Sequence, residues 1–316
     1  MPVRSAPRTL LRRPRDFALL SIGAAVFTIA LKTAAWRATG SVGLLSDAIE
    51  SLVNLAAALM AYWALGLAAK PADRGHPYGH SKAEYFASGL ESALIVVAAL
   101  AIIQTALGRL WAPEPLEQIG LGLGLSLLSS GINALVAWML LQAGRRFDSI
   151  TLRADGHHLL TDVWTSIGVV LALALVQWSG LAWLDPLIAI AVALNIVFTG
   201  WRLLRETASG LLDGAMPESE QRQLEALLAN ASGEGISFHA LRSRVAGARR
   251  FVSFHVLVPG AWSVAEGHAL CERLEQQIRE ALPNTHVFTH LEPIEDPSAW
   301  NDQDFHWERQ SERNGP

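Results

Sequence analysis

The chain has 316 residues, of which 51% are hydrophobic and only 17% are charged. This composition excludes an intrinsically disordered chain and is unusual for a soluble enzyme, so we expect a protein inserted in a membrane. The single cysteine, Cys271, excludes a disulfide framework within one chain, and a net charge of −4 without a basic stripe argues against nucleic acid as a partner.

The charges divide the chain into two parts. Residues 1–212 hold 16 basic and 13 acidic residues, a net charge of +3, whereas residues 213–316 hold 9 basic and 16 acidic residues, a net charge of −7. We therefore predict a transmembrane domain at residues 1–212, a cytoplasmic domain at residues 213–296 and a disordered polar tail at residues 297–316.

Six apolar runs follow an arginine-rich N-terminus, and each is near the ~20 residues that cross a bilayer. No small-residue cleavage site follows the first run, so we interpret it as a retained helix and not as a signal peptide. Lys and Arg collect on one side of a six-pass path, which predicts that both termini are cytoplasmic in a cell (inner) membrane. The runs are Phe17–Trp36, Leu44–Ala69, Tyr85–Leu110, Gly120–Gln142, Leu152–Trp178 and Pro186–Leu204.

Two of these runs carry ionisable or amide side chains at helical spacings of three and four, so each set lies on one helical face. An ionisable group inside a membrane costs at least a few kcal/mol, which makes both stripes candidates for function. The stripes are Asp47, Glu50 and Asn54 in the second run and Asp155, His158 and Asp162 in the fifth.

Facing each other, the two stripes would bring four ligands together over one helical turn, about 6 Å of rise, which suits a tetrahedral metal site. One imidazole with several oxygens suits Zn²⁺, Fe²⁺, Co²⁺ or Mn²⁺ and not Cu⁺. These groups must lose protons to bind metal, so metal and protons compete, which is the physical basis of antiport. The alternative is that the stripes only hold two helices together. The isolated Lys32, Glu91, Asn133 and Asn195 are interpreted as structural.

Residues beyond Met216 have the periodicities of a small α+β domain in the order αββαβ. This order favours a ferredoxin-like sheet covered on one face. The predicted elements are a helix at Glu218–Ala231, strands at Ile236–Val245 and Arg250–Val258, a helix at Ser263–Leu282 and a strand at His286–Glu292.

Three motifs in this order resemble the cation diffusion facilitator family. They are SVGLLSDAIESLVN at residues 41–54, HPYGHSKAE at residues 76–84, and ADGHH at residues 154–158 followed by Asp162. Members of that family export divalent transition metals and combine six spans with a cytoplasmic ferredoxin-like domain. The resemblance covers the chain from about residue 17 to residue 293 and implies the same architecture and activity here.

The resemblance implies a transport site formed by Glu50, Asn54, His158 and Asp162. In the zinc-type pattern the second span supplies His or Asp followed four residues later by Asp, whereas this chain has Glu and Asn. The loss of one carboxylate leaves the preferred metal open. Either Asp47 or Asp155, one turn away, could supply the missing charge.

The resemblance also implies a second metal site in the loop, at Asp73, His76 and His80. The two histidines share a face if Pro77 opens a helix, and the alternative is a solvated loop that binds nothing. Lys82 is similar to a family residue that forms an interlock with an aspartate after the sixth span, here Asp213.

Five residues of the acidic domain fall at positions where family members bind regulatory metal at a dimer interface. His290 and Glu292 are two apart on a predicted strand and point the same way, with His255 on the neighbouring strand. The alternative is a set of surface histidines on an acidic domain. The five are His239, His255, His268, His290 and Glu292.

These observations together predict a homodimeric secondary transporter that moves a divalent metal (Zn²⁺, Fe²⁺, Co²⁺ or Mn²⁺) out of the cytoplasm against protons by alternating access. The alternative is a membrane-bound sensor or receptor that binds metal without transport. A metalloenzyme is disfavoured because no HExxH, Ser-Lys or Ser-His constellation lies in a span. The sequence leaves the proton stoichiometry open.

Overall fold

The structure is a computed structural model that describes residues 13–303, apart from residues 40–41, 112–120, 182 and 234. Some side chains within the described helices also lie outside the description, among them those of Asp47 and Glu50. The chain forms two compact units, residues 1–211 and residues 212–316.

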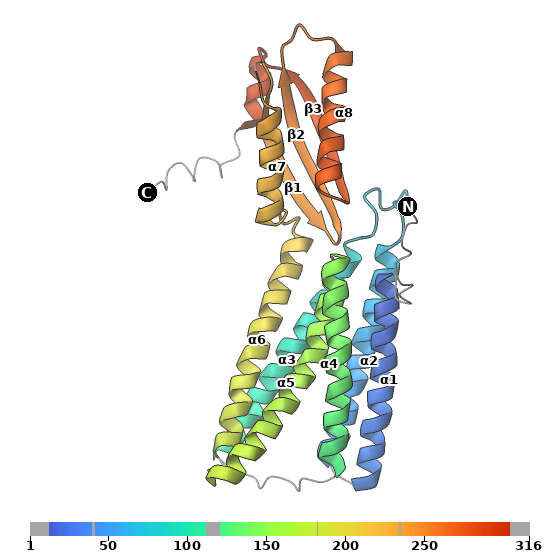
Figure 1. Cartoon of the computed structure of the whole chain (residues 1–316), viewed down its shortest axis with the longest axis vertical. Helices are drawn as coiled ribbons and strands as arrows, with labels where there is room; N and C mark the ends of the chain where they lie inside the picture. Colours follow the sequence, from blue (N-terminus) through green and yellow to red (C-terminus); the bar gives the residue numbers. More distant parts are fainter. Residues whose placement is uncertain (1–12, 40–41, 112–120, 182, 234, 304–316) are drawn as a thin grey trace, which may run out of the picture. The chain divides into compact units, whose positions relative to one another are not determined.

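The first unit is a bundle of six long helices (Figure 1). Each helix contains 26 to 30 residues, and each overlaps one predicted apolar run. The helices are α1 (Pro14–Thr39), α2 (Val42–Ala68), α3 (Ala83–Trp111), α4 (Leu121–Arg146), α5 (Ile150–Ser179) and α6 (Leu184–Leu211).

Four of these helices are long and apolar enough, over their described residues, to cross a membrane. The spans are Pro14–Ala34, Ala83–Trp111, Leu127–Arg146 and Pro186–Leu211, and α2 contributes the shorter apolar segment Asn54–Ala68. Large apolar side chains such as Trp63, Trp138 and Phe198 are exposed on the bundle, as a lipid environment requires. The first unit is therefore a helical membrane domain. That α2 and α5 also cross the bilayer stays a prediction.

Two hydrophobic clusters hold the bundle together. One joins α1, α4 and α5 through residues such as Ala18, Leu140 and Leu152, and the other joins α3 to α6 through Ile95 and Ile196. Small residues allow close approach: a Cβ added at Gly156 of α5 would lie 2.9 Å from Leu141 Cγ of α4. Close packing of this kind is what associates helices in lipid, where no hydrophobic driving force acts between them.

The second unit has the predicted element order αββαβ (Figure 1). Strand β1 pairs with β2 in antiparallel fashion and β2 pairs with β3 in parallel, which makes a small mixed sheet of order β1-β2-β3. The elements are α7 (Glu218–Ala231), β1 (Ser237–Ala246), β2 (Arg249–Val258), α8 (Val264–Ala281) and β3 (Thr285–Pro293).

Both helices of this unit cover the same face of the sheet. Leu224 of α7 and Leu274 of α8 pack with Val252, Phe254 and Val256 of β2 in one core. Successive strand residues point to opposite faces, so His255 points away from the helices. We call this opposite side of the sheet the histidine face.

A β-bulge in β1 decides which side chains reach the histidine face. Register runs regularly up to His239, which pairs with His255, and resumes at Arg242, which pairs with Ser253. Ala240 and Leu241 therefore oppose the single residue Phe254, and Ala240 takes a positive φ of 51°. As a result, His239 and Arg242 both lie on the histidine face although they are three residues apart.

The predicted disorder from Pro297 differs from the structure, which has a short 3₁₀ helix, η1 (Pro297–Gln303). Asp296 Oδ1 accepts hydrogen bonds from the backbone N–H and the hydroxyl of Ser298, and Ala299 is buried. The polar composition of these residues predicted a solvated tail, whereas in the structure they have one buried alanine and the hydrogen bonds of Asp296. Residues 304–316 lie outside the described part of the chain.

Candidate metal-binding sites

The predicted stripes of α2 and α5 meet through side-chain hydrogen bonds. Asn54 Nδ2 donates to Asp162 Oδ2 at 2.6 Å, and Asn54 Oδ1 lies 2.8 Å from His158 Nε2. Asn54 and His158 are buried at 5% and 6% exposure. Three of the four predicted core residues thus lie within one hydrogen-bonded chain between two helices. The fourth, Glu50, is in α2, but its side chain lies outside the description.

The distance between Asn54 Oδ1 and His158 Nε2, 2.8 Å, is close to the spacing of donor atoms around a metal ion. Donor atoms around one tetrahedral ion lie roughly 3.3 Å apart, because metal–ligand bonds are about 2.0–2.1 Å long. The contact with Asp162 is made by the other amide atom, Asn54 Nδ2, at 2.6 Å, which is a hydrogen-bond donor and not a metal ligand.

Asn133 of α4 completes this network, although the sequence interpretation had treated it as structural. Its Nδ2 donates to Asp162 Oδ2 at 3.1 Å, so the same carboxylate oxygen accepts from two helices. One turn away, Ser130 donates to Ser166 of α5 at 2.6 Å. A second signal was present in the sequence: Ser130 and Asn133 are three apart and form their own short polar stripe.

Asp155 does not join the transport-site cluster. It lies two helical turns from Asp162, and its Oδ1 accepts from the hydroxyl of Ser21 in α1 at 3.1 Å. The carboxylate is 1% exposed. Of the two residues proposed to replace the missing charge, Asp155 thus points at another helix, and the side chain of Asp47 lies outside the description.

The loop between α2 and α3 brings its three predicted residues together. His76 Nδ1 and His80 Nε2 each lie 3.4 Å from a carboxylate oxygen of Asp73, and the two rings are 4.3 Å apart. Ligand atoms of all three lie within 4.8 Å of one another. The condition under which the two histidines would share a helical face is not met, since Pro77 opens no helix and α3 begins at Ala83. A turn, in place of a helical face, aligns the histidines.

Backbone groups hold Asp73 in its ionised form. Its Oδ1 accepts from the N–H groups of His76 at 2.7 Å and of Gly75 at 2.9 Å. The hydrogen bond from His76 lowers the pKa of Asp73 below its ordinary value. His80 is the most buried of the three, with 9% of its side chain exposed against 62% for His76. The cluster is therefore a charged carboxylate with two imidazoles at a loop surface.

Four of the five predicted residues of the cytoplasmic domain gather on the histidine face. His239, His255 and His290 occupy matching register positions on β1, β2 and β3. Glu292 Oε2 lies 3.0 Å from His239 Nε2 and 3.2 Å from His255 Nδ1, and its Oε1 lies 3.4 Å from His290 Nε2. One carboxylate therefore sits among three imidazoles. We call these four residues the histidine cluster.

The fifth residue, His268, is separate from this cluster within one chain. It is exposed on α8, which packs against the other face of the sheet. The predicted interlock also stays a prediction: Lys82 Nζ donates to the carbonyl of Leu211 at 3.2 Å, while Asp213 pairs with Arg244 at 3.0 Å.

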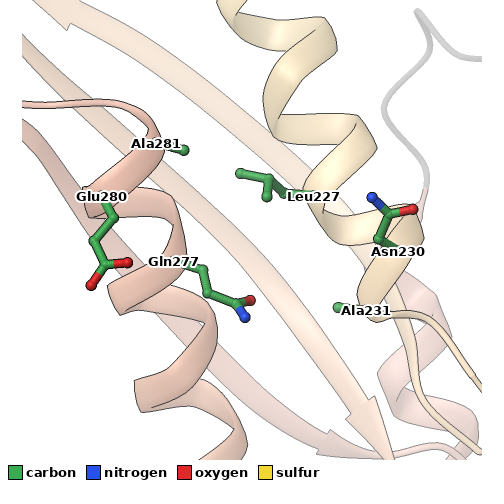
Figure 2. A pocket seen from close by; sticks show the side chains of 6 residues that line it. All are labelled: Leu227, Asn230, Ala231, Gln277, Glu280 and Ala281. Carbon is green, nitrogen blue, oxygen red and sulfur yellow. The ribbon is translucent and has the colours of Figure 1, made fainter.

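A groove of about 520 Å³ lies between α7 and α8, on the helix side of the sheet. Figure 2 shows the six side chains that line it. Its lining is a mixture of small, apolar and amide groups with one carboxylate, and it includes no histidine. The groove is thus unrelated to the candidate metal ligands. The lining residues are Leu227, Asn230, Ala231, Gln277, Glu280 and Ala281.

The structure thus has a helical membrane domain and two clusters of histidine and carboxylate side chains that could hold a metal ion. Comparison with known proteins agrees: the model of the cation efflux transmembrane domain matches residues 18–212, and the model of the cation efflux protein cytoplasmic domain matches residues 216–294. The chain belongs to the cation efflux family, the cation diffusion facilitators.

Individual relatives extend over nearly the whole chain. The uncharacterized transporter sll1263 of Synechocystis sp. (strain ATCC 27184 / PCC 6803 / Kazusa) is 54% identical over 93% of this chain and 94% of its own length. The cation-efflux pump FieF of Yersinia pestis (strain Pestoides F) is 31% identical over 92% of this chain and 96% of its own. A solved structure of CzrB, described as a candidate zinc transporter, matches 25% of this chain and 96% of its own with 35% identity and a TM-score of 0.24.

These matches identify the chain as a membrane transporter for divalent metal cations and not an enzyme, with a C-terminal cytoplasmic domain. They confirm the family that the sequence motifs predicted.

Proposed function

We propose that the chain exports a divalent transition-metal ion from the cytoplasm in exchange for protons. The observation that carries this proposal is the network of Asn54, His158 and Asp162 between α2 and α5. Glu50, from the same face of α2, is the fourth proposed ligand. The donor set of one imidazole and three oxygens suits Zn²⁺, Fe²⁺, Co²⁺ or Mn²⁺.

The hydrogen bonds of the network supply a physical route to proton coupling. When His158 is the imidazolium, both ring nitrogens carry protons, and Nε2, which lies 2.8 Å from Asn54 Oδ1, has no free electron pair for a metal. Loss of the Nε2 proton to water leaves a neutral imidazole that keeps its proton on Nδ1. Metal entry therefore requires the Nε2 proton to leave, and proton return favours metal release. In the same exchange, the carboxylate of Asp162 would gain the metal ion as an ionic partner when metal binds and lose it when metal leaves. Metal and proton thus compete for one site.

Alternating access fits the way the ligands are distributed. The proposed ligands come from α2 and α5, and Asn133 adds a link to α4. Because three helices share one carboxylate, a change in helix packing on either side of the site would open it toward that side. The loop cluster of Asp73, His76 and His80, next to the end of α2, is proposed as a second metal site of the same transporter.

The test of the transport site is Asp162→Asn in proteoliposomes. The amide oxygen of Asn keeps an acceptor for Asn54 and Asn133 but removes the charge, so the variant separates chemistry from folding. We expect metal-driven proton flux to be abolished while the dimer persists in size-exclusion chromatography. Asn195→Gln, on the exposed side of α6, is the control. Unchanged flux in Asp162→Asn would refute the assignment.

The histidine cluster is proposed as a regulatory metal site at a homodimer interface. Glu292 and three imidazoles offer a chelating set, and His268 could join only from a second copy, since it lies on the opposite side of its own sheet. Bound metal would also offset the repulsion between two acidic domains. A variant with both His255→Ala and His290→Ala should lose the metal dependence of transport; if that dependence is kept, the regulatory role is wrong.

The finer architecture is proposed on the same basis. Six crossings with both termini in the cytoplasm follow from the positions of the basic residues. A ferredoxin-like sheet without its first strand would leave the parallel pair β2 and β3 as neighbours, which agrees with the register here. Isotope uptake into vesicles separates transport from the alternative, a sensor that binds without transport, and the family comparison favours transport.

A further inference from the structure

The segment that follows β3 lies beyond the residues that the family's domain models match. The match to the family's cytoplasmic domain ends at residue 294, and η1 begins at Pro297. The segment is nevertheless anchored. Trp300 Nε1 donates to the carbonyl of Ile294 at 3.1 Å, Asp296 Oδ1 accepts from the backbone N–H and the hydroxyl of Ser298 at 2.9 and 2.8 Å, and Ala299 is only 3% exposed.

This segment places an aromatic ring against the histidine cluster. The ring of Trp300 lies 5.9 Å from that of His239, with 36° between the planes. The ring of His255 contacts His239 as well, at 4.9 Å and nearly perpendicular. The imidazole of His239 is thus packed between two rings, and only 8% of its side chain is exposed.

The hydrogen bonds of His239 explain why such packing matters. Its Nε2 faces Glu292, but its Nδ1 is buried and, among the described residues, has no hydrogen-bond partner. Metal-binding histidines usually donate their second nitrogen to a carboxylate or carbonyl, which fixes the ring. Among the described residues, His239 Nδ1 has no such acceptor, so packing against the neighbouring rings fixes the orientation of the His239 ring.

We propose that Trp300 is a positioning residue of the histidine cluster, holding the His239 ring in its ligating orientation and shielding it from water. The inference rests on the proposed binding of metal by this cluster. A preoriented ligand loses less conformational freedom when the metal binds, so the segment 297–303 strengthens metal affinity. It does so without contacting the metal itself.

The test measures Co²⁺ and Zn²⁺ binding by the purified full-length protein in detergent. The part of the metal binding that is lost in His255→Ala is assigned to the histidine cluster. For this part, we expect Trp300→Ala to weaken metal affinity by about 10-fold, as is typical when a residue that orients a ligand is removed. Trp300→Phe retains a packed ring and should stay within about 2-fold of the parent. The Co²⁺ absorption spectrum of the cluster should change in Trp300→Ala and be restored in Trp300→Phe.

A second variant addresses the segment without touching the ring. Asp296→Ala removes the acceptor that holds the start of η1 and should weaken affinity in the same direction as Trp300→Ala. Glu280→Ala removes one carboxylate from α8, on the other side of the sheet, and controls for the loss of negative charge. It should bind as the parent does.

Each outcome has a definite meaning. Parental affinity in Trp300→Ala, or equal weakening in Trp300→Phe and Trp300→Ala, overturns the positioning role. If His255→Ala loses no binding at all, the proposed metal site itself is wrong and the positioning role falls with it. The two failures are therefore distinguished by the His255→Ala measurement.

Discussion

Asn133 donates a hydrogen bond to Asp162, and its substitution tests the proposed transport site most directly. Asn133→Ala removes one of the two amide donors to Asp162 Oδ2. A hydrogen bond to a charged group contributes about 1.5–3 kcal/mol. Because the bond from Asn133 is 3.1 Å long against 2.6 Å for that from Asn54, we expect the lower end, about 1.5 kcal/mol, which corresponds to roughly tenfold in affinity.

The assay is metal uptake into proteoliposomes as a function of metal concentration. We expect the KM for metal to rise about tenfold in Asn133→Ala, because Asp162 loses the bond that orients it. Asn195→Ala makes the same substitution on the exposed side of α6 and should leave the KM unchanged. An unchanged KM in Asn133→Ala would show that Asn133 only packs helices. A lower KM would show that its hydrogen bond competes with metal, and either result refutes the positioning argument.

Three further predictions concern packing and charge. Gly267→Ala in α8 places a Cβ against the side chain of Leu291, so thermal denaturation should show the cytoplasmic domain destabilised by about 1–3 kcal/mol, whereas Gly233→Ala, with open space around it, should be near neutral. Glu91 in α3 is fully buried, and neither of its carboxylate oxygens has a hydrogen-bond partner among the described residues. Because a buried charge without a partner is costly, Glu91→Gln should leave the unfolding temperature unchanged or raise it. A lower unfolding temperature would mean that the charge is needed. Hydrogen bonding lowers the pKa of Asp73, so the stability that Asp73 adds to the loop turn should be complete above the ordinary pKa of aspartate. That stability should be lost as the pH falls through the lower pKa of the folded state. The NMR shift of the His76 amide can follow this loss, and an amide shift that does not change with acid contradicts the prediction.

The order of elements could be predicted from the sequence because periodicity is a local property. Six apolar runs and the αββαβ pattern correspond to α1–α6 and to the cytoplasmic elements, with boundaries that differ by a few residues. The histidine cluster could also be predicted. His290 and Glu292 are two apart on a strand and share a face, and the family resemblance supplied the other members. The element order thus rests on short-range spacing, whereas the full histidine cluster also needed the family resemblance.

What the sequence missed depends on contacts between distant elements. Asn133 looked isolated because its partner Asp162 is 29 residues away on another helix. Asp155 has the right spacing for the α5 stripe, yet its carboxylate turns toward Ser21, 134 residues earlier, because α1 packs beside α5. The sequence predicts a disordered tail at η1 because amino-acid composition carries no signal for a single contact such as that of Trp300 with His239.

The irregular step in β1 has a consequence for how this domain tolerates change in chain length. If the pairing of Arg242 with Ser253 continued without interruption, His239 would stand opposite Val256 and point into the core, and the imidazole row would lose one member. Removing Ala240 would instead straighten the strand and keep His239 opposite His255. Deletion of one residue from β1 at Ala240 is therefore compatible with metal chelation by the histidine cluster. A shift of the β1–β2 register by one residue is not.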